Sequence, residues 1–208
     1  MTMIEDQAVV LFQGDSITDC GRNYGDFNSL GHGYALMVAA EFGRKYPEKQ
    51  VQFLNRGISG NRVVDLERRW QEDCLDLKPT WVSIYIGVND TWRRYDSNDP
   101  TSAEQYYEGY RRLILNTKES LDALILLIEP FVVPIPEDRK TWREDLDPKI
   151  QAVRELALEF KTPYVPLDGL FAAHSTRTGP AYWAEDGVHP SPAGHSLIAK
   201  AWLDAVEA

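Results

Sequence analysis

Three short polar segments, each containing glycine, could together supply most of the groups that hydrolyse an ester. They are Gly14-Asp15-Ser16-Ile17-Thr18, Gly57-Ile58-Ser59-Gly60-Asn61 and Gly87-Val88-Asn89-Asp90. A serine hydrolase needs a hydroxyl nucleophile, together with hydrogen-bond donors directed at the oxyanion that forms during attack. Ser16 offers the hydroxyl and its own backbone N–H, Gly60 a second N–H, and Asn89 a side-chain amide. These residues are therefore candidates for a nucleophile and an oxyanion hole.

A fourth segment, Asp186-Gly187-Val188-His189-Pro190, could supply the general base. The carboxylate of Asp186, three residues before His189, could fix one imidazole nitrogen while the other nitrogen faces Ser16. Taken singly, these residues have simpler explanations, because Ser16 could merely cap a helix and Asp186 could form an Asx turn. The hydrolase interpretation therefore depends on the four segments together.

Three other histidines compete with His189 for the role of base. His195 falls within the last predicted helix, where a packing or surface role is expected, and a metal site formed with His189 would lack further ligands. His32 lies between two glycines in a loop with no accompanying carboxylate motif. His174 lies in a polar stretch and is expected to be solvated. We therefore assign the base to His189.

The elements that must position these segments alternate along the chain. Apolar runs rich in β-branched residues predict strands at Val9 to Gln13, Val51 to Asn55, Trp81 to Ile86, Ala123 to Ile128 and Tyr164 to Pro166. Helical periodicity predicts helices at Tyr34 to Tyr46, Val63 to Leu75, Thr101 to Ser120, Asp147 to Phe160 and Pro192 to Val206. This alternation predicts an α/β fold, with a five-stranded parallel sheet between two layers of helices. A length of 208 residues suits one domain, 1–208.

In such a sheet, ligands bind at the carboxyl ends of the strands, near the point where the strand order reverses. Three of the polar segments each follow a predicted strand, and the fourth precedes a helix that Ser191 could cap, with Pro192 in its first turn. We therefore expect all four segments to meet at one edge of the sheet. The stretch Phe131 to Asp145 is expected to be a long surface connection that could form part of a substrate rim.

The four segments resemble the four sequence blocks of the SGNH (GDSL) hydrolase superfamily, in the same order and over essentially the whole chain. The matching residues are Gly14-Asp15-Ser16, Gly60, Gly87-x-Asn89-Asp90 and Asp186-x-x-His189, with Ile17 in place of the leucine of the family name. The resemblance implies a flavodoxin-like α/β/α sandwich with Ser16 as nucleophile and Asp186 and His189 as acid and base. It also implies an oxyanion hole formed by Ser16 N–H, Gly60 N–H and the Asn89 side chain.

The stretch from Gly57 to Asp96 is similar to bacterial intracellular acetylxylan esterases of this superfamily. It contains Ile58-Ser59-Gly60-Asn61, Arg69-Trp70-x-Glu72-Asp73, Trp81-Val82-Ser83-Ile84 and Asn89-Asp90-x-Trp92-Arg93-x-Tyr95-Asp96. This resemblance implies an esterase that removes acetyl groups from the xylose units of xylo-oligosaccharides.

Several further residues are candidates for contact with a substrate. Trp92, Arg93 and Tyr95 follow Asn89 closely, so they should border the oxyanion side of the cleft, although packing or a subunit contact would explain them equally well. Trp183 could form a wall of the acyl pocket or anchor the core. Asp15 is expected to hydrogen-bond the turn that holds Ser16.

Composition restricts the partners. With 22 Lys and Arg against 32 Asp and Glu, the formal charge is −10 and no basic stripe offsets it, which disfavours nucleic acid and anionic membranes. Cys20 and Cys74 are far apart without metal-ligand spacing, so two unpaired thiols are expected. The first residues do not resemble a signal peptide, and we expect a cytoplasmic protein. The expected mechanism needs no cofactor or metal, and a homo-oligomer remains open.

Rival functions remain at this stage. The four blocks specify the chemistry but leave the leaving group open, so a broad carboxylesterase, a thioesterase or a lysophospholipase is an alternative. A non-catalytic carbohydrate-binding protein on the same fold would be expected to lack Ser16, Asn89 or His189, and all three are present. A dinucleotide-binding protein is disfavoured because no G-x-G-x-x-G motif follows the first predicted strand.

Overall fold

The computed structural model describes residues 2–208 and contains one parallel sheet of five strands. The strands are β1 (Val9–Gly14), β2 (Gln52–Asn55), β3 (Trp81–Tyr85), β4 (Leu124–Ile128) and β5 (Tyr164–Val165), in the spatial order β2-β1-β3-β4-β5. Each neighbouring pair is parallel. The order reverses between β1 and β3, because the chain first moves outward to β2 and then returns past β1. The predicted α/β class with a five-stranded parallel sheet is confirmed.

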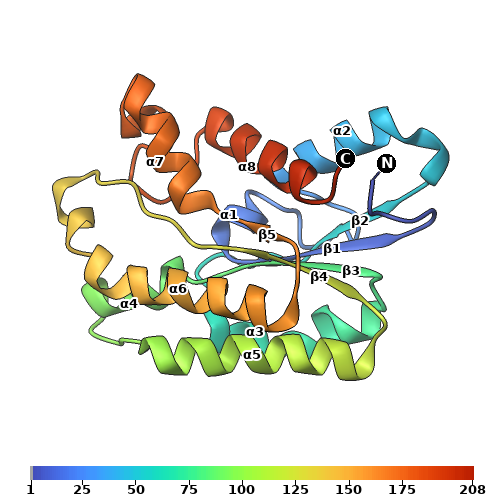
Figure 1. The fold of residues 1–208 in the computed structure, drawn as a ribbon, viewed down its shortest axis with the longest axis horizontal. Helices are drawn as coiled ribbons and strands as arrows, with labels where there is room; N and C mark the ends of the chain where they lie inside the picture. The colour runs from blue at the N-terminus through green and yellow to red at the C-terminus, as the bar shows by residue number, and fades with distance from the viewer. Residues whose placement is uncertain (1) are drawn as a thin grey trace.

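Helices cover both faces of this sheet, as Figure 1 shows. The helices α2 (Tyr34–Lys45) and α8 (Pro192–Ala205) pack together on one face, with α7 (Leu167–Thr178) beside α8. The helices α3 (Val63–Asp73), α5 (Ala103–Ser120) and α6 (Arg143–Phe160) cover the other face. Two short helices, α1 (Ser16–Asp19) and α4 (Val88–Asp96), directly follow β1 and β3. One-turn 3-10 helices lie at Pro47–Lys49, Leu75–Leu77, Glu137–Lys140 and Pro180–Tyr182.

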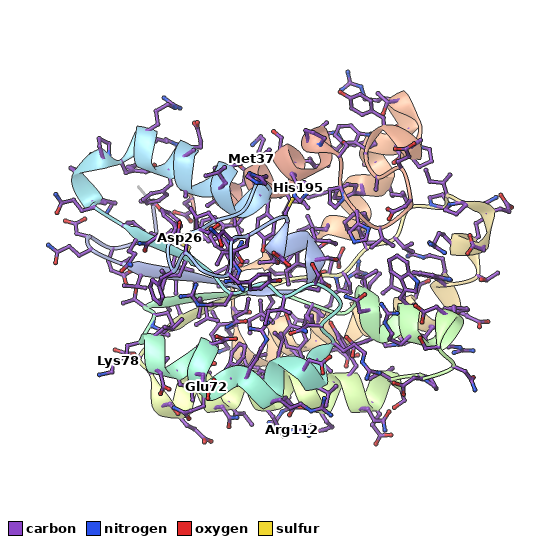
Figure 2. The ribbon with its side chains drawn as sticks, turned by 180° about the vertical axis from the view of Figure 1, so that it is seen from behind. Asp26, Met37, Glu72, Lys78, Arg112 and His195 are labelled. Carbon is purple, nitrogen blue, oxygen red and sulfur yellow. The ribbon has the colours of Figure 1, made fainter. Side chains whose placement is uncertain are left out.

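The strands are buried on both faces, which explains their nearly continuous apolar sequences. Because successive side chains of a strand point to opposite faces, β1 contributes to two separate hydrophobic clusters. Val10 and Phe12 belong to the cluster beneath α2 and α8, where the Phe12 ring lies 5.5 Å from that of Trp202. Leu11 belongs to the opposite cluster, with Leu66 of α3. Figure 2 shows His195 in the upper layer and Glu72 and Arg112 in the lower one.

Some elements differ from the sequence predictions. The helices α1, α4 and α7 were not predicted, because two of them are short and follow glycine turns, and the third lacks a clear apolar stripe. The expectation of a surface connection over Phe131 to Asp145 is wrong at both ends. Phe131 is buried after β4, and Trp142 is buried just before α6, whose start at Arg143 precedes the predicted start. Prolines indicated irregular backbone there, but burial of these aromatic side chains draws the segment into the core.

No helix among residues 2–208 is both long enough and apolar enough to span a bilayer.

Candidate active site

The candidate residues gather at the carboxyl ends of β1, β2 and β3, next to the point where the strand order reverses. Ser16 is the first residue of α1, directly after β1, and Asp15 is the N-cap of that helix. The Asp15 carboxylate accepts a hydrogen bond from the Ile17 N–H at 3.0 Å. A cap of this kind satisfies a donor at the start of the helix, so the turn presents Ser16 in a fixed orientation.

Ser16, His189 and Asp186 form a continuous hydrogen-bonded chain. The Ser16 Oγ lies 2.9 Å from His189 Nε2, and His189 Nδ1 lies 2.6 Å from Asp186 Oδ2. The other carboxylate oxygen of Asp186 accepts the backbone N–H groups of Val188 and His189. A carboxylate can only accept, so the neutral imidazole carries its proton on Nδ1 and leaves Nε2 to accept from the serine hydroxyl.

Electrostatics around the pair favour a base that titrates above its ordinary value. The hydrogen bond to Asp186 raises the pKa of His189, with a smaller contribution from the nearby charge of Asp15. Burial opposes ionisation of Asp186, but the bonds from the His189 ring and from two backbone N–H groups outweigh it and hold the pKa of that carboxyl below its usual range. Asp186 therefore stays ionised and stabilises an imidazolium at His189.

Besides Ser16, the predicted oxyanion residues lie in the loop 57–61 and in the helix α4. Gly60 follows β2 with φ of 82°, a left-handed conformation that favours glycine, in the loop 57–61. The Ile58 N–H donates to the Gly14 carbonyl at 3.1 Å, which fastens this loop to the end of β1. Asn89, in the first turn of α4, is buried, and its side-chain amide donates to the Asn61 carbonyl at 3.1 Å. The structure thus brings the candidate donors to the nucleophile turn.

Arg69 of α3 is a contributor that sequence reasoning did not single out as functional. Its guanidinium donates to the Gly14 carbonyl, the Asn61 side chain and the Gln13 side chain. It also pairs with Asp73 at 3.0 Å. These contacts join the ends of β1 and the loop 57–61 to α3. An arginine on a polar helix carries no sequence signal for this role, because its partners lie far away along the chain.

Asp15 is buried beneath this site. Burial raises the pKa of Asp15 to about 7, against the lowering effects of the Ile17 hydrogen bond and the His189 charge. The side chain caps α1, as its position predicts, and is too deeply buried to line an open surface.

Of the three candidate substrate contacts on α4, Trp92 lies nearest the base. Its ring centroid is 6.0 Å from that of His189 and 5.2 Å from that of Trp142. Tyr95 stacks on Trp142 on the outer side of this cluster. Arg93 pairs with Asp96 on the helix surface. The structure therefore places Trp92 beside the reacting groups and the other two farther out.

The cluster is completed by Arg139, which the sequence did not indicate. Its guanidinium lies 4.0 Å from the Trp142 ring centre and 5.1 Å from that of Trp92, and its Nε donates to the Asp186 carbonyl at 3.3 Å. The segment 131–145, which the sequence suggested could form part of a substrate rim, therefore holds the loop of the proposed base.

Trp183 packs on the side of α7. Its ring centroid is 5.1 Å from those of His174 and Tyr182. His174 is thus partly packed on Trp183, where the sequence suggested full solvation. A hollow of about 480 Å³ opens beside His189 and is lined by Glu185, Asp186, His189, Pro190, Ser191 and Pro192. A larger hollow of about 650 Å³ lies between α2 and α8, and none of the candidate residues lines it.

The remaining histidines and the cysteines have other partners, although Cys20 lies close to the nucleophile, since its N–H donates to the Ser16 carbonyl at 2.9 Å. His195 is buried in α8, where its Nδ1 accepts the Tyr34 N–H at 3.1 Å and its Nε2 lies 3.4 Å from Cys20 Sγ, which fulfils the expected packing role. His32 is exposed. Cys20 and Cys74 are both free thiols, as predicted. Within residues 2–208, no group of three or more His, Cys, Asp or Glu side chains could hold a metal ion.

Known proteins are similar to this chain in sequence and in fold. Residues 12–197 match the model of the GDSL-like lipase/acylhydrolase family. The chain is 40% identical over 202 residues to an acetylxylan esterase of Geobacillus stearothermophilus. The matched region covers 93% of this chain and 91% of the relative.

Two solved structures are similar over nearly the whole chain. The structure of Axe2, an acetylxylan esterase from G. stearothermophilus, gives a TM-score of 0.88 at 37% identity, covering 98% of this chain and 96% of that one. A Parabacteroides merdae protein named for its likeness to GDSL lipases gives a TM-score of 0.93 at 37% identity, covering 98% and 97%. Solved catalytic mutants of Axe2 carry alanine in place of a serine, an aspartate or a histidine. These are the residue types of the hydrogen-bonded chain described above.

Proposed function

Because the chain belongs to the GDSL-like lipase/acylhydrolase family and is a carboxylic ester hydrolase, we propose that it removes O-acetyl groups from acetylated xylo-oligosaccharides, with Ser16 as the nucleophile. The observation that carries this assignment is the chain of hydrogen bonds from Ser16 Oγ through His189 to Asp186, at 2.9 and 2.6 Å. This geometry puts a base within reach of the hydroxyl and a carboxylate behind the base, as acyl transfer through a serine requires.

In the first half of the reaction, Ser16 Oγ forms a bond to the acetyl carbon while its proton moves to His189 Nε2. The bond between the acetyl carbon and the sugar oxygen then breaks, and that oxygen takes the proton from Nε2. In the second half, water attacks the acyl-enzyme and gives its proton to Nε2, which returns it to Ser16 Oγ as acetate leaves. Asp186 stabilises the imidazolium that exists between these transfers.

The carbonyl oxygen becomes an oxyanion in both halves. The donors proposed for it are the backbone N–H of Ser16, the backbone N–H of Gly60 and the Asn89 side-chain amide. The N–H groups at the start of a helix have no intrahelical acceptor, which makes the Ser16 N–H suitable. Donors fixed in a partly buried site stabilise developing charge more strongly than water does, because they need no reorganisation.

The choice of substrate rests on similarity. The relative with 40% identity is an acetylxylan esterase, and a solved variant of Axe2 is described as an acetyl-xylooligosaccharide esterase. Trp92, next to His189, offers an aromatic face on which a sugar ring could stack. The formal charge of −10 also suits a neutral carbohydrate better than a polyanion.

The proposal is tested by acetate release from acetylated xylo-oligosaccharides, compared with a panel of simple esters, thioesters and lysophospholipids. We expect kcat/KM for the acetylated sugar to exceed that for each simple ester, and Ser16→Ala to abolish release on every substrate. Equal or better turnover of simple esters would favour the broad esterase. Full activity of Ser16→Ala would refute the proposed nucleophile.

A further inference from the structure

Asp19 is the last residue of the one-turn helix that begins with Ser16, and its buried carboxylate accepts hydrogen bonds from three residues in two segments. Its Oδ1 accepts the Arg22 N–H at 3.1 Å, which is a local turn contact. Its Oδ2 accepts the Tyr24 hydroxyl at 2.6 Å. The same oxygen accepts both the N–H and the hydroxyl of Ser59, at 3.2 and 2.7 Å.

The contacts with Ser59 matter because Ser59 directly precedes Gly60. The loop 57–61 also packs tightly on α1, since a Cβ added at Gly57 would collide with the Asp19 backbone nitrogen. Asn55 supports the same junction, because its side chain donates to the Thr18 carbonyl and accepts the Gly57 N–H. The helix of the nucleophile and the loop of Gly60 are therefore joined side by side. Asp19 is the acidic group in that joint, and Arg22 is its basic counterpart, because the Arg22 guanidinium donates to the Gly57 carbonyl.

We infer that Asp19 is a positioning residue for the oxyanion hole, which holds the Gly60 N–H in register with Ser16 by binding Ser59. This inference rests on the proposed function, because it takes Gly60 as an oxyanion donor. Asp19 touches no reacting atom in this scheme. It acts through the backbone of the residue before Gly60.

The ionised form of Asp19 suits this role. Burial alone would raise its pKa, but the hydrogen bonds from Tyr24, Ser59 and Arg22 together hold the pKa below its ordinary value. A charged acceptor binds N–H and O–H donors more strongly than a neutral one. Capping of α1 requires only hydrogen bonds within its first turn. The hydrogen bonds between Ser59 and Asp19 instead join residues 40 positions apart and tie the loop 57–61 to the helix.

Three variants separate the loop contact from the rest of the network. Asp19→Asn removes the charge and replaces one carboxylate oxygen with an NH2 donor. Either the Arg22 N–H or the donors of Tyr24 and Ser59 then lose their acceptor, and the others keep only a neutral one. Ser59→Ala removes one donor from an exposed residue of the loop and should leave the fold intact. Tyr24→Phe is the matched control, because it removes a hydrogen bond from the same carboxylate and leaves both hydrogen bonds between Asp19 and Ser59 in place.

The readouts are kcat and KM on an acetyl ester and inhibition by a small alkyl boronic acid, which forms a tetrahedral adduct with an active serine. Removal of one oxyanion donor typically lowers kcat about 10²-fold. Asp19→Asn should only shift the Gly60 N–H, so we expect kcat to fall roughly tenfold and KM to change less than about threefold. The boronic acid should bind Asp19→Asn more weakly by a similar factor. Ser59→Ala should lose several-fold in kcat, and Tyr24→Phe less than about twofold.

The outcomes distinguish this inference from the proposed function. If Ser16→Ala is inactive while Ser59→Ala and Asp19→Asn retain wild-type kcat and boronate affinity, the positioning role is refuted and the serine mechanism stands. Equal losses in Tyr24→Phe and Ser59→Ala would also overturn it, since the carboxylate would then act only through the fold of α1. If Asp19→Asn fails to fold, the comparison of kcat between Ser59→Ala and Tyr24→Phe still tests the positioning role of Asp19.

Discussion

The two halves of the active site are built differently. The proposed nucleophile and oxyanion half rests on buried side chains: Asp15, Asp19 and Asn89 are only 1%, 4% and 3% exposed, whereas Ser16 is half-buried and Gly60 is exposed. The acid and base half is open, because the side chains of Asp186 and His189 remain 44% and 45% exposed. Side chains in the first half are fixed by contacts between strand ends and helices. The second half is a surface loop whose geometry depends on a few contacts.

Those few contacts of the base loop are specific. The Gly187 carbonyl accepts the Val133 N–H at 2.9 Å, and the Asp186 carbonyl accepts the Arg139 Nε–H. On the far side, the Ser191 N–H donates to the Trp183 carbonyl at 2.8 Å. We therefore expect substitutions of the buried side chains in the first half to lower both the free energy of unfolding and kcat. Side-chain changes in the open half should reduce turnover alone.

The largest effect is expected for the pair that joins the two halves. Ser16→Ala and His189→Ala should each lower kcat/KM by roughly 10⁴-fold or more, and the double variant should be no worse, because the two groups act as a unit. Initial rates on p-nitrophenyl acetate measure this. Thermal unfolding of His189→Ala should remain close to wild type because the ring is half-exposed, and a large loss of stability would break the comparison.

Asn89→Ala should come next, with kcat reduced on the order of 10²-fold and KM little changed, since the lost donor acts on charge that appears only in the transition state. Unlike His189→Ala, it should also lower the free energy of unfolding by about 1–3 kcal/mol, because the Asn61 carbonyl loses a buried donor. Steady-state kinetics and chemical denaturation together check both parts. A defect in KM alone would assign Asn89 to ground-state binding.

Gly187→Ala tests how strongly backbone contacts hold the open half. Gly187 has φ of 87°, and a Cβ there would collide with the Ile135 carbonyl oxygen, so the loop must shift. We expect kcat/KM to fall about tenfold, since small misplacements of catalytic groups are costly. Gly43→Ala is the control, because a Cβ at this position in α2 meets nothing within 4 Å, and it should leave activity unchanged. Wild-type activity in Gly187→Ala would mean that the loop tolerates displacement.

The length of the substrate's acyl chain can be varied to test which aromatic residue closes the acyl pocket. If the pocket holds little more than a methyl group, each further methylene is forced against a packed wall at about 1–3 kcal/mol, which exceeds its burial gain of about 0.8 kcal/mol. On p-nitrophenyl esters, kcat/KM should fall from acetate to butyrate and nearly vanish by octanoate. Because Trp92 lies beside His189, Trp92→Ala should relax this preference several-fold more than Trp183→Ala. The opposite order would restore Trp183 as the wall that the sequence suggested.

The smallest expected effect is that of the Asp15 charge, in one half of the site, on the pKa of His189 in the other. In the proposed mechanism neutral His189 is the active base, so kcat/KM should rise with pH through the pKa of His189, which the Asp186 hydrogen bond raises above the ordinary value. Where the Asp15 carboxyl is ionised, its charge adds to this, so Asp15→Asn should move the midpoint to lower pH by less than about one unit. Because burial raises the pKa of Asp15 to about 7, this effect is largest above that pH. Rates from pH 5 to 9 measure both. A flat pH profile of kcat/KM from pH 5 to 8 would contradict His189 as the base. An unchanged midpoint in Asp15→Asn would mean that the charge of Asp15 does not affect the pKa of His189.

Much of the fold and the site was predictable because the signals are local. Apolar runs indicated the five strands to within about two residues, and the positions of Ser16, Gly60 and Asn89 just after three of those strands followed from glycine turns. Asp186 and His189 were predicted as a pair because they lie three positions apart in one turn. The short helices α1 and α4 were missed, since a helix of one to three turns after a glycine carries little periodicity.

The sequence alone determined the types of reacting groups, their order and the strand that precedes each of the first three. Tertiary structure alone decided which distant side chains support them. Asp19 and Ser59, Arg69 and Gly14, and Arg139 and Asp186 are brought together by the sheet order and by the path of the chain between strands. The physical reason is range: turn and strand preferences arise between near neighbours, whereas these hydrogen bonds exist only after burial has packed remote segments against each other.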